Sequence, residues 1–477
     1  MSITIDSPGR VNRRLGRVGE LVIIMAMSSL MGLAQSGRPN ILFISVDDLN
    51  NDLGCYGNST VQSPQIDRLA ARGVRFDRAY TQYPLCNPSR ASLLSGRRPE
   101  RTGIYELQTA PRRAMPEAIF LPQLFRRNGY FTARYGKIYH EGRDDRLSWD
   151  ISDSSEFVDE EERRAHQLRY ARPQNERTPD WRPLDTPEPL TRDARTVAAV
   201  ARLMEEQVAA GRPFFLAAGL NKPHLPWNVP KSYYGLYAAD QLRLAADPPM
   251  RRIPLVALMT ELYGAAQPSS REEAVAAYYA AISYMDRQVG VLLDQLDRLK
   301  LWERTIVVLF SDHGFHLGDH GGLWAKLTLF EQSARTPLLI AAPTGRRAEA
   351  SPRVVELLDL YPTLAELAGL EVPPGLEGRS LVPLLREPRR RWDHVARTMV
   401  YHETKEGKVE GRSICDERWR YTEWDGGERG RELYDHRRDP REFNNLAGLP
   451  QYAGTERRLR QQLASMPRPV KAWETQR

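Results

Sequence analysis

Acidic residues follow two apolar runs of the chain, at positions where they could bind a cation. Asp47 and Asp48 come directly after the apolar run 40–46, and Asp312 and His313 follow a second such run. Short apolar runs are typical of buried parallel strands, and ligands bind at the carboxyl ends of such strands. Adjacent carboxylates repel one another unless a cation neutralises them, and Ca²⁺ takes carboxylate oxygens. We expect a shared metal site with His313 as its weaker ligand; acidic caps of two helices are the alternative.

Cys86 opens a segment that predicts a helix with an anion-binding N-terminus. Pro88 fits the first turn of a helix, which places Cys86 at the helix start. Free backbone N–H groups and the helix dipole favour an anion there. Arg90 lies four residues further on, hence on the same face, and can also reach an anionic group. A capped helix with a buried cysteine is the alternative.

Strand patterns and helix patterns alternate around these residues, which predicts an α/β fold built on a largely parallel sheet. Ser63 is the expected N-cap of the first helix, with Pro64 in its first turn. The predicted strands are 40–46, 74–80, 131–135, 213–219, 305–310 and 337–341. The predicted helices are 63–72, 121–128, 193–207 and 272–300.

The chain of 477 residues is long enough for two domains. A stretch rich in Pro, Gly and Arg at 369–391 marks a change in composition. We therefore expect a catalytic domain over 35–375 and a smaller C-terminal α+β subdomain over 376–477. The expected antiparallel strands of this subdomain are 398–402, 412–416 and 419–424, with a final helix near 454–465.

The first 34 residues have the pattern of an export signal. Several arginines precede the mostly apolar stretch 21–33, which is too short to span a membrane comfortably. No other segment has the pattern of a transmembrane helix. We expect residues 1–34 to be a signal peptide and the mature protein to be periplasmic or secreted, with an uncleaved anchor as the alternative.

Composition narrows the possible partners. The formal net charge of +7 favours polyanions such as sulfated glycans, nucleic acid or anionic membranes, although genomic bias toward arginine is an equal explanation. The basic residues are scattered, with short runs such as 388–391, and this counts against nucleic acid. The three cysteines form no disulfide framework, and we expect Cys55 and Cys415 to be buried thiols rather than a pair.

Residues 86–97 read Cys-Asn-Pro-Ser-Arg-Ala-Ser-Leu-Leu-Ser-Gly-Arg and resemble the signature of type I sulfatases, in which the cysteine is oxidised to formylglycine. The resemblance extends over most of the chain and implies an alkaline-phosphatase-like fold. Within the family the chain is most similar to the iduronate-2-sulfatase-like branch. That likeness depends on the motifs 136–140 (Gly-Lys-Ile-Tyr-His), 221–224 (Asn-Lys-Pro-His) and 311–314 (Ser-Asp-His-Gly).

The resemblance assigns a metal site to this sequence. Asp47, Asp48, Asp312 and His313 would hold one Ca²⁺ per chain, with the modified Cys86 also coordinated. Many sulfatases carry Asn at the position of His313, whereas the iduronate-like branch has His.

The resemblance also assigns residues around the sulfate group. Lys137 and His140 match the family's Lys and His, in the Lys-x-x-His spacing of the iduronate-like branch rather than the commoner Lys-x-His. His224 and Lys326 match the remaining sulfate-facing positions. In the implied reaction His224, helped by Lys326, protonates the departing alcohol, and His140 removes a proton from the modified cysteine. Arg90 and the two lysines stabilise negative charge.

The implied function is hydrolysis of sulfate monoesters on a sulfated polysaccharide or oligosaccharide, similar to iduronate 2-sulfate. The expected partners are this sulfated glycan and a formylglycine-generating or sulfatase-maturating enzyme, with no nucleic acid and no stable membrane span. Two alternatives stay open: a phosphate or phosphonate monoester hydrolase of the same superfamily, and a non-catalytic glycan-binding relative.

Overall fold

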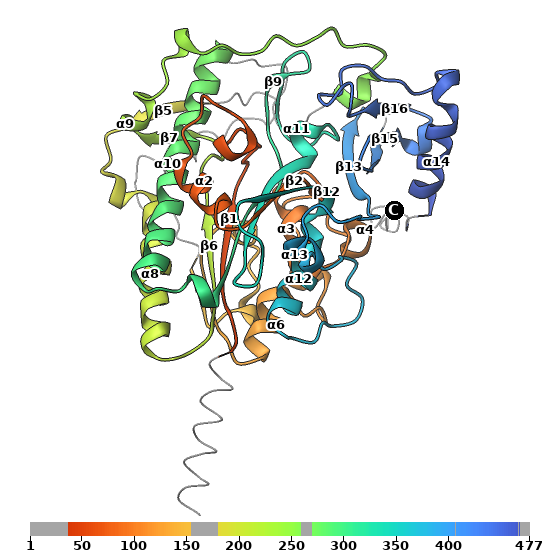
Figure 1. Ribbon diagram of the computed structural model, residues 1–477. Coiled ribbons are helices and arrows are strands. Elements are labelled where there is room, and N and C mark those ends of the chain that lie inside the picture. Colours follow the sequence, from red (N-terminus) through yellow and green to blue (C-terminus); the bar gives the residue numbers. More distant parts are fainter. Residues whose placement is uncertain (1–36, 154–179, 259–269, 406, 466, 468–477) are drawn as a thin grey trace, which may run out of the picture. The chain divides into compact units, whose positions relative to one another are not determined.

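An eight-stranded sheet forms the centre of the protein, with the strand order β12-β2-β11-β8-β1-β6-β3-β4 (Figure 1). The computed structural model describes residues 37–153, 180–258, 270–405, 407–465 and 467. The predicted signal peptide 1–34 lies outside the described residues. Residues from Asn40 onward form a unit of their own. The strands are β1 (Asn40–Val46), β2 (Val74–Tyr80), β3 (Phe131–Gly136), β4 (Ile151–Asp153), β6 (Phe214–Leu220), β8 (Thr305–Ser311), β11 (Arg335–Ala341) and β12 (Glu349–Glu356).

The sheet is mainly parallel, as predicted, and contains one antiparallel strand. Strand β1 pairs in parallel with β6 and β8, and β6 pairs in parallel with β3. Strand β11 runs antiparallel to both of its neighbours, β2 and β8. Its apolar run looks like that of the parallel strands because it is equally buried, so the sequence pattern did not reveal its direction.

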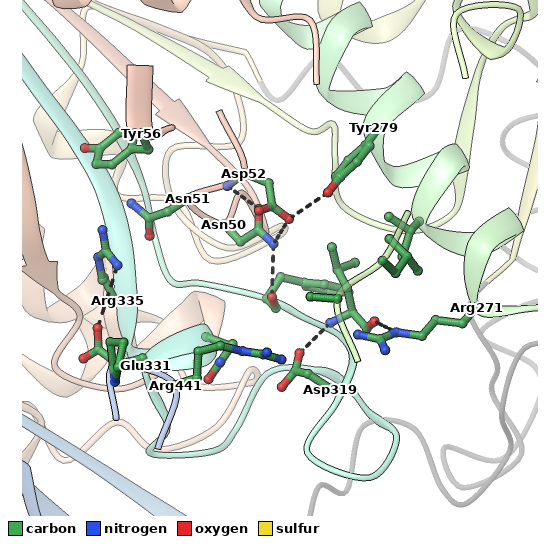
Figure 2. A pocket seen from close by; sticks show the side chains of 17 residues that line it. Asn50, Asn51, Asp52, Tyr56, Arg271, Tyr279, Asp319, Glu331, Arg335 and Arg441 are labelled. Carbon is green, nitrogen blue, oxygen red and sulfur yellow. Dashed lines mark hydrogen bonds and ion pairs between the residues drawn. The ribbon is translucent and has the colours of Figure 1, made fainter. Parts of the chain in front are cut away.

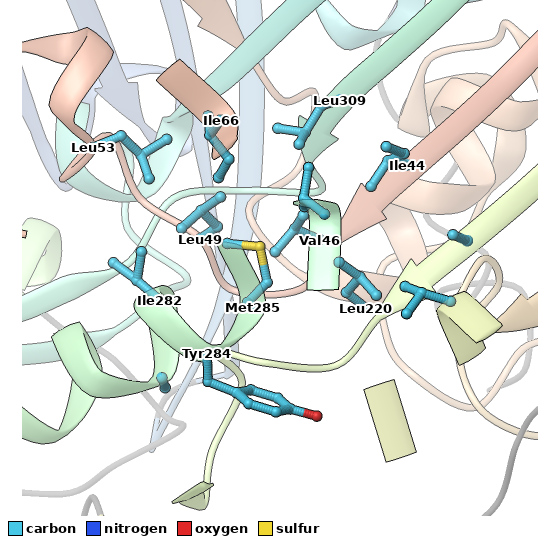
Figure 3. Packing of buried hydrophobic residues seen from close by; sticks show 14 of the residues in the cluster. Ile44, Val46, Leu49, Leu53, Ile66, Leu220, Ile282, Tyr284, Met285 and Leu309 are labelled. Atoms are coloured by element: carbon cyan, nitrogen blue, oxygen red, sulfur yellow. The ribbon is translucent and has the colours of Figure 1, made fainter. Parts of the chain in front are cut away.

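Helices cover both faces of the sheet, which explains why its strands are apolar throughout. Leu42, Ile44 and Val46 of β1 pack on one side with α2 (Pro64–Ala70), α8 (Arg192–Ala209) and α10 (Arg271–Arg298) (Figures 1 and 3). Alternate residues Ile41 and Phe43 face the other side. The period-two alternation of side chains thus fills two cores from one strand. The helices of the second side are α3 (Cys86–Ser95), α6 (Leu121–Arg127), α12 (Leu360–Leu367) and α13 (Val382–Arg386).

A second sheet of four antiparallel strands follows in the C-terminal part of the chain. Helix α14 (Ala453–Ala464) packs on it through Leu459 and Leu463, which join Ile414 and Leu433 in one apolar cluster. The predicted antiparallel sheet and final helix are confirmed. The predicted domain boundary after residue 375 stays a prediction. The strands of this sheet are β13 (Ala396–Thr404), β14 (Gly407–Cys415), β15 (Trp419–Trp424) and β16 (Gly430–Asp435).

Short elements connect these layers. Two pairs of short strands lie outside both sheets: β5 (Trp181–Leu184) with β7 (Trp227–Pro230), and β9 (His316–Asp319) with β10 (Leu323–Ala325). No helix in the described part of the chain has the length and apolar content to cross a membrane. The remaining short helices are α4 (Pro99–Thr102), α5 (Pro111–Ala114), α9 (Lys231–Tyr234) and α11 (Glu331–Ala334).

Ser63 is the N-cap residue of helix α2 and Pro64 lies in its first turn, as predicted. The Ser63 side chain makes no capping bond to this helix and instead accepts a hydrogen bond from Gly54 N, at 2.8 Å. The free N–H groups of Gln65 and Ile66 donate to the carboxylate of Asp286 on α10, at 3.0 and 2.7 Å. A cap supplied by a distant helix satisfies the same donors and leaves no local signal in the sequence.

Candidate active site

The carboxylates that follow β1 and β8 leave the sheet at the same edge. Val46 and Ser311 are paired in register, so Asp47 and Asp312 emerge side by side. The backbone N–H of Asp48 donates to Asp312 Oδ1 at 3.4 Å, and all three carboxylates are buried. Asp48 has a φ of 61°, a left-handed conformation that Asp tolerates better than most residues. The predicted convergence of two strand ends is therefore observed.

Cys86 is the first residue of helix α3 and lies among these acidic residues. Its Sγ is 3.5 Å from Asp47 Oδ1 and 3.4 Å from His313 Nε2. The ammonium groups of Lys326 and Lys137 donate to the same sulfur, at 3.2 and 3.8 Å. Burial and Asp47 raise the pKa of the thiol, but the two lysines outweigh them and leave it below its ordinary value.

Arg90 is buried and connects the carboxylates to α3. Its Nε donates to Asp312 Oδ2 at 2.9 Å, and its Nη2 donates to Asp47 Oδ1 at 3.2 Å. Its Nη1 donates to the carbonyl of Lys137 at 2.6 Å. The guanidinium thus fixes the relative positions of both strand ends and of the helix that begins at Cys86.

Two lysines bind the carboxylates from other segments. Lys137 Nζ donates to Asp47 Oδ2, and Lys326 Nζ donates to Asp48 Oδ1. The residues on either side of Lys326, Ala325 and Leu327, have φ values of 71° and 70°. Backbone strain of this kind costs about 1–3 kcal/mol per residue and is characteristic of functional segments.

Glycine allows Lys137 to approach the sheet. Gly219, near the end of β6, accepts a hydrogen bond from Lys137 N at 2.9 Å. A Cβ on Gly219 would lie 2.4 Å from that nitrogen, and a Cβ on Gly136 would lie 2.1 Å from the Gly219 carbonyl oxygen. Any larger residue at either position would push the segment that carries Lys137 away from β6.

Two histidines complete the group. His224 Nε2 lies 4.0 Å from Asp47 Oδ2 and 3.9 Å from Asp48 Oδ2, while its Nδ1 is 2.6 Å from the carbonyl of Leu225. A carbonyl only accepts, so Nδ1 carries the proton and Nε2 faces the carboxylates. Burial lowers the pKa of His224 well below its ordinary value, and burial followed by Lys137 lowers the pKa of His140 to about 3. His140 Nδ1 is buried and has no hydrogen-bond partner.

The carboxylate oxygens of the donor set fit a hard cation, whereas the Cys86 thiol and the His313 imidazole are softer donors. The ligand atoms of Asp47, Cys86, Asp312 and His313 all lie within 4.8 Å of one another. Asp48 Oδ2 is buried and has no hydrogen-bond partner in the described part of the chain, which is costly for a carboxylate unless a cation reaches it. Burial raises the pKa of Asp48 to about 7, against the opposing effect of Lys326. The cluster therefore has an oxygen that a divalent cation would satisfy.

Several residues that position the site were not predicted from the sequence. Tyr278 on α10 donates through its hydroxyl to the carbonyl of Asp48, at 2.8 Å. Ser89 Oγ donates to the carbonyl of Asp312, at 2.5 Å. Asp193 on α8 accepts hydrogen bonds from the backbone N–H groups of residues 221 and 222, in the segment that leads to His224. Ser89 belongs to the cysteine motif and could have been found there, whereas the two helical residues carry no local signal.

A polar cavity of about 380 Å³ adjoins the loop that follows Asp48, and Figure 2 shows the side chains that line it. Asn50 donates to Asp52 Oδ2 at 3.2 Å and to the carbonyl of Phe315 at 3.4 Å. The hydroxyl of Tyr279 lies 3.5 Å from the same carboxylate oxygen. The predicted site residues do not line this cavity, and its hydrogen bonds hold the loop that carries the metal-site carboxylates.

Comparisons with known proteins agree with this geometry. Residues 39–370 match the family model described as Sulfatase. The chain belongs to the sulfatase family. It is therefore a sulfuric ester hydrolase, and the resemblance found in the sequence is confirmed. Residues 318–468 match a second model, described as N-sulphoglucosamine sulphohydrolase, C-terminal.

Individual relatives cover most of this sulfatase. It is 34% identical over 422 residues to iduronate 2-sulfatase of Homo sapiens, with 76% of this chain and 74% of the relative covered. It is 31% identical over 477 residues to a sulfatase of Formosa agariphila, covering 92% and 88%. Among solved structures, the phosphonate monoester hydrolase of Agrobacterium radiobacter superposes with a TM-score of 0.74 at 24% identity, covering 90% and 95%. That similarity confirms the alkaline-phosphatase-like fold.

Proposed function

We propose that this sulfatase removes sulfate from a sulfated polysaccharide or oligosaccharide, with a substrate similar to iduronate 2-sulfate. The observation that carries the proposal is the convergence of the carboxylates of Asp47, Asp48 and Asp312 on Cys86, at the N-terminus of α3. The 34% identity to human iduronate 2-sulfatase supports the class of substrate.

The site would contain two groups that the family uses. Asp47, Asp48, Asp312 and His313 would hold Ca²⁺ beside residue 86, and the unpartnered Asp48 Oδ2 supports this assignment. Ca²⁺ would polarise the sulfate oxygens, and formylglycine made from Cys86 would supply a hydroxyl nucleophile.

The charged side chains bind the sulfate group. Lys326 and Lys137 already reach the sulfur of residue 86, so their ammonium groups also lie near the oxygens of a sulfate attached or bound there. Fixed positive charges in a buried site stabilise the negative charge that moves to these oxygens during transfer. Arg90 acts as a positioning residue, since its donors are occupied by Asp47, Asp312 and a backbone carbonyl.

The two histidines move protons. A sulfate ester brings negative charge close to His224, which favours the protonated ring and lets Nε2 donate to the departing alcohol. The contact between Nδ1 and the carbonyl of Leu225 fixes the ring in this orientation. His140, whose depressed pKa keeps it neutral, takes a proton from the side chain of residue 86 in the second half of the reaction.

The proposal includes export and maturation. Residues 1–34 would direct the protein to the periplasm or the exterior, and a formylglycine-generating or sulfatase-maturating enzyme would modify Cys86. The catalytic domain would span 35–375 and the C-terminal subdomain 376–477. The match to the Sulfatase model ends at residue 370, close to this boundary.

The test has two measurements: the mass of the peptide that contains Cys86, and the rates of hydrolysis of an aryl sulfate and an aryl phosphate. We expect the mass of the Cys86 peptide to correspond to an aldehyde in place of the thiol after expression with a maturating enzyme. We expect that preparation to hydrolyse an aryl sulfate at least about tenfold faster than the matching aryl phosphate, a difference of about 1.4 kcal/mol in activation free energy. A plain thiol in an active preparation, or a preference for phosphate, would overturn the proposal.

A further inference from the structure

An arginine-rich groove of about 760 Å³ lies in the C-terminal part of the protein, away from the residues of the candidate active site. Arg353 of β12, Arg397 of β13 and Arg458 of α14 contribute to its wall. Arg418 lies in the turn between β14 and β15, and Arg391 belongs to the basic run 388–391. Segments distant in sequence thus bring five guanidinium groups to one groove.

Acidic residues balance some of these charges. Four of the arginines have carboxylate partners, and the fifth, Arg397, has no ion pair among the described residues. The pairs are Arg353 with Glu417 at 2.6 Å, Arg391 with Asp393 at 3.3 Å, Arg418 with Asp435 at 2.7 Å and Arg458 with Asp416 at 2.8 Å.

Two residues that line the groove carry a buried hydrogen-bond donor with no acceptor among the described residues. Arg397 Nε is buried without a partner, and burial together with nearby Arg98 lowers the pKa of Arg397. Trp392 is only 5% exposed, and its indole Nε1 is likewise buried without a partner. Donors that have lost water without gaining an acceptor raise the free energy of the unbound protein. Because both atoms are buried, a bound anion would reach the exposed guanidinium groups of the groove instead, those of Arg391 and Arg458.

We propose that this groove binds a sulfated glycan at a second site, apart from Cys86. The inference depends on the proposed function, because it makes a sulfated polymer, rather than a small sulfate ester, the natural substrate. Sulfate groups match the forked donors of arginine, and the groove volume admits several sugar residues.

The mixture of charges favours a glycan over nucleic acid. Asp393 and Glu417 have side chains that are 77% and 46% exposed, so sugar hydroxyls can donate to them. Double-stranded DNA carries about one negative charge per 1.7 Å of helix axis, and such a dense array would be repelled by both carboxylates. In a sulfated glycan the sulfates can face the arginines while the sugar hydroxyls face the acids.

The test compares matched arginine variants with heparin as the probe. The groove variant combines Arg391→Gln with Arg397→Gln, and the control combines Arg202→Gln on α8 with Arg298→Gln on α10. Arg202 and Arg298 are exposed and paired with Glu206 and Glu205, so the control removes the same two charges outside the groove. We expect the groove variant to bind heparin roughly tenfold more weakly at fixed salt, and the control to match the unaltered protein. Neutral dextran should not bind, and a DNA duplex should bind more weakly than heparin.

Three results would overturn the inference: equal heparin binding by the groove variant and the control, DNA binding as tight as heparin binding, or a loss of aryl sulfate turnover in the groove variant. If the double variant unfolds, Arg391→Gln combined with Arg458→Gln replaces it, since both residues line the groove and have exposed side chains. Heparin binding needs no turnover. If the protein binds heparin in the groove but cleaves no sulfate ester, the proposed function is wrong and the inference of a glycan-binding groove still holds.

Discussion

Two buried clusters of this protein contain the same types of residue and differ in one respect. The first surrounds Cys86 at the edge of the central sheet. The second, here the Cys415 cluster, lies beside the C-terminal sheet and consists of Glu331, Cys415, Arg420, His436 and Glu442. Both thiols have a pKa below the ordinary value, because cationic neighbours outweigh the opposing effect of burial.

Every charged group of the Cys415 cluster has its partners within the protein. Arg420 donates to Glu442 at 2.6 Å and to Glu331, and His436 lies 2.6 Å from Glu442. The second oxygen of Glu442 accepts from the backbone N–H of Glu331 at 2.8 Å. The Cys86 cluster instead leaves Asp48 Oδ2 without a hydrogen-bond partner among the described residues. The residue types and the lowered thiol pKa are therefore common to both clusters and do not distinguish a structural cluster from a reactive one. The distinguishing feature is a buried polar atom without a hydrogen bond.

The largest effect is expected from the unpartnered carboxylate. Asp48→Asn removes the negative charge that the cation would neutralise and should lower kcat for an aryl sulfate roughly a thousandfold, or about 4 kcal/mol. The melting temperature should change less than in the Glu442 variant described next. Equal activity of Asp48→Asn and the unaltered enzyme would show that Asp48 binds no catalytic cation. The comparison between the two clusters would then fail.

Glu442→Gln tests the opposite behaviour. The substitution removes the carboxylate that pairs with the buried Arg420 and His436. Because breaking a buried ion pair costs roughly 3 kcal/mol, the free energy of unfolding should fall by about this amount. Activity per folded molecule at 25 °C should stay within about twofold, because the residue does not contact the Cys86 cluster. Denaturant unfolding and aryl sulfate kinetics on the same sample measure both quantities. A stable but inactive variant would contradict the structural role.

The pH dependence of stability sharpens the comparison. Burial lowers the pKa of His436, but Glu331 and then Cys415 outweigh it and raise the pKa to about 10. A raised pKa stabilises the folded state fully below the unfolded value of about 6.5, and this contribution is lost as pH rises to about 10.

Thermal unfolding between pH 6 and pH 10 measures this effect. His436→Gln should be less stable than the unaltered protein at pH 6, and the difference should shrink as pH rises toward about 10. A difference that stays constant with pH would show that His436 is not charged in the folded protein.

The smallest effect is expected from a residue that only positions the metal-site loop. Tyr278→Phe removes the hydrogen bond donated to the carbonyl of Asp48 and the one accepted from the backbone N–H of Asn50, which should cost about 1 kcal/mol and reduce kcat roughly fivefold. Tyr361→Phe is the matched control, since its hydroxyl donates to the carbonyl of Ile119, at 2.7 Å, rather than to any group of the metal-site loop. If the two variants have equal kinetics, Tyr278 does not position the catalytic residues.

Much of the fold was predictable because local patterns define it. Strands such as β1 and β8 are short apolar runs, and α10 is a long amphipathic helix, so each carries its own signal. Strand β12 contains Pro352 and several charged residues, and it lies at an edge of the sheet, where burial is incomplete. Its pattern was too weak to predict, as was that of β16.

The candidate site was predictable where motifs are contiguous. Asp47 and Asp48 end one strand, and Cys86 and Arg90 share one helix turn, so spacing alone indicated their neighbours. The contact of Lys326 with Cys86 joins residues 240 positions apart, and only the family resemblance suggested it. Contacts that tertiary packing creates leave no periodic trace in a single sequence.

The most direct test exchanges the two cysteines for alanine, one at a time, in protein produced with a maturating enzyme. Cys86→Ala should reduce aryl sulfate turnover at least about a thousandfold, because the nucleophile is lost. Cys415→Ala should keep turnover within about threefold and change only thermal stability. Substantial turnover by Cys86→Ala, or an equal loss in both variants, would contradict the assignment of the Cys86 cluster as the catalytic centre.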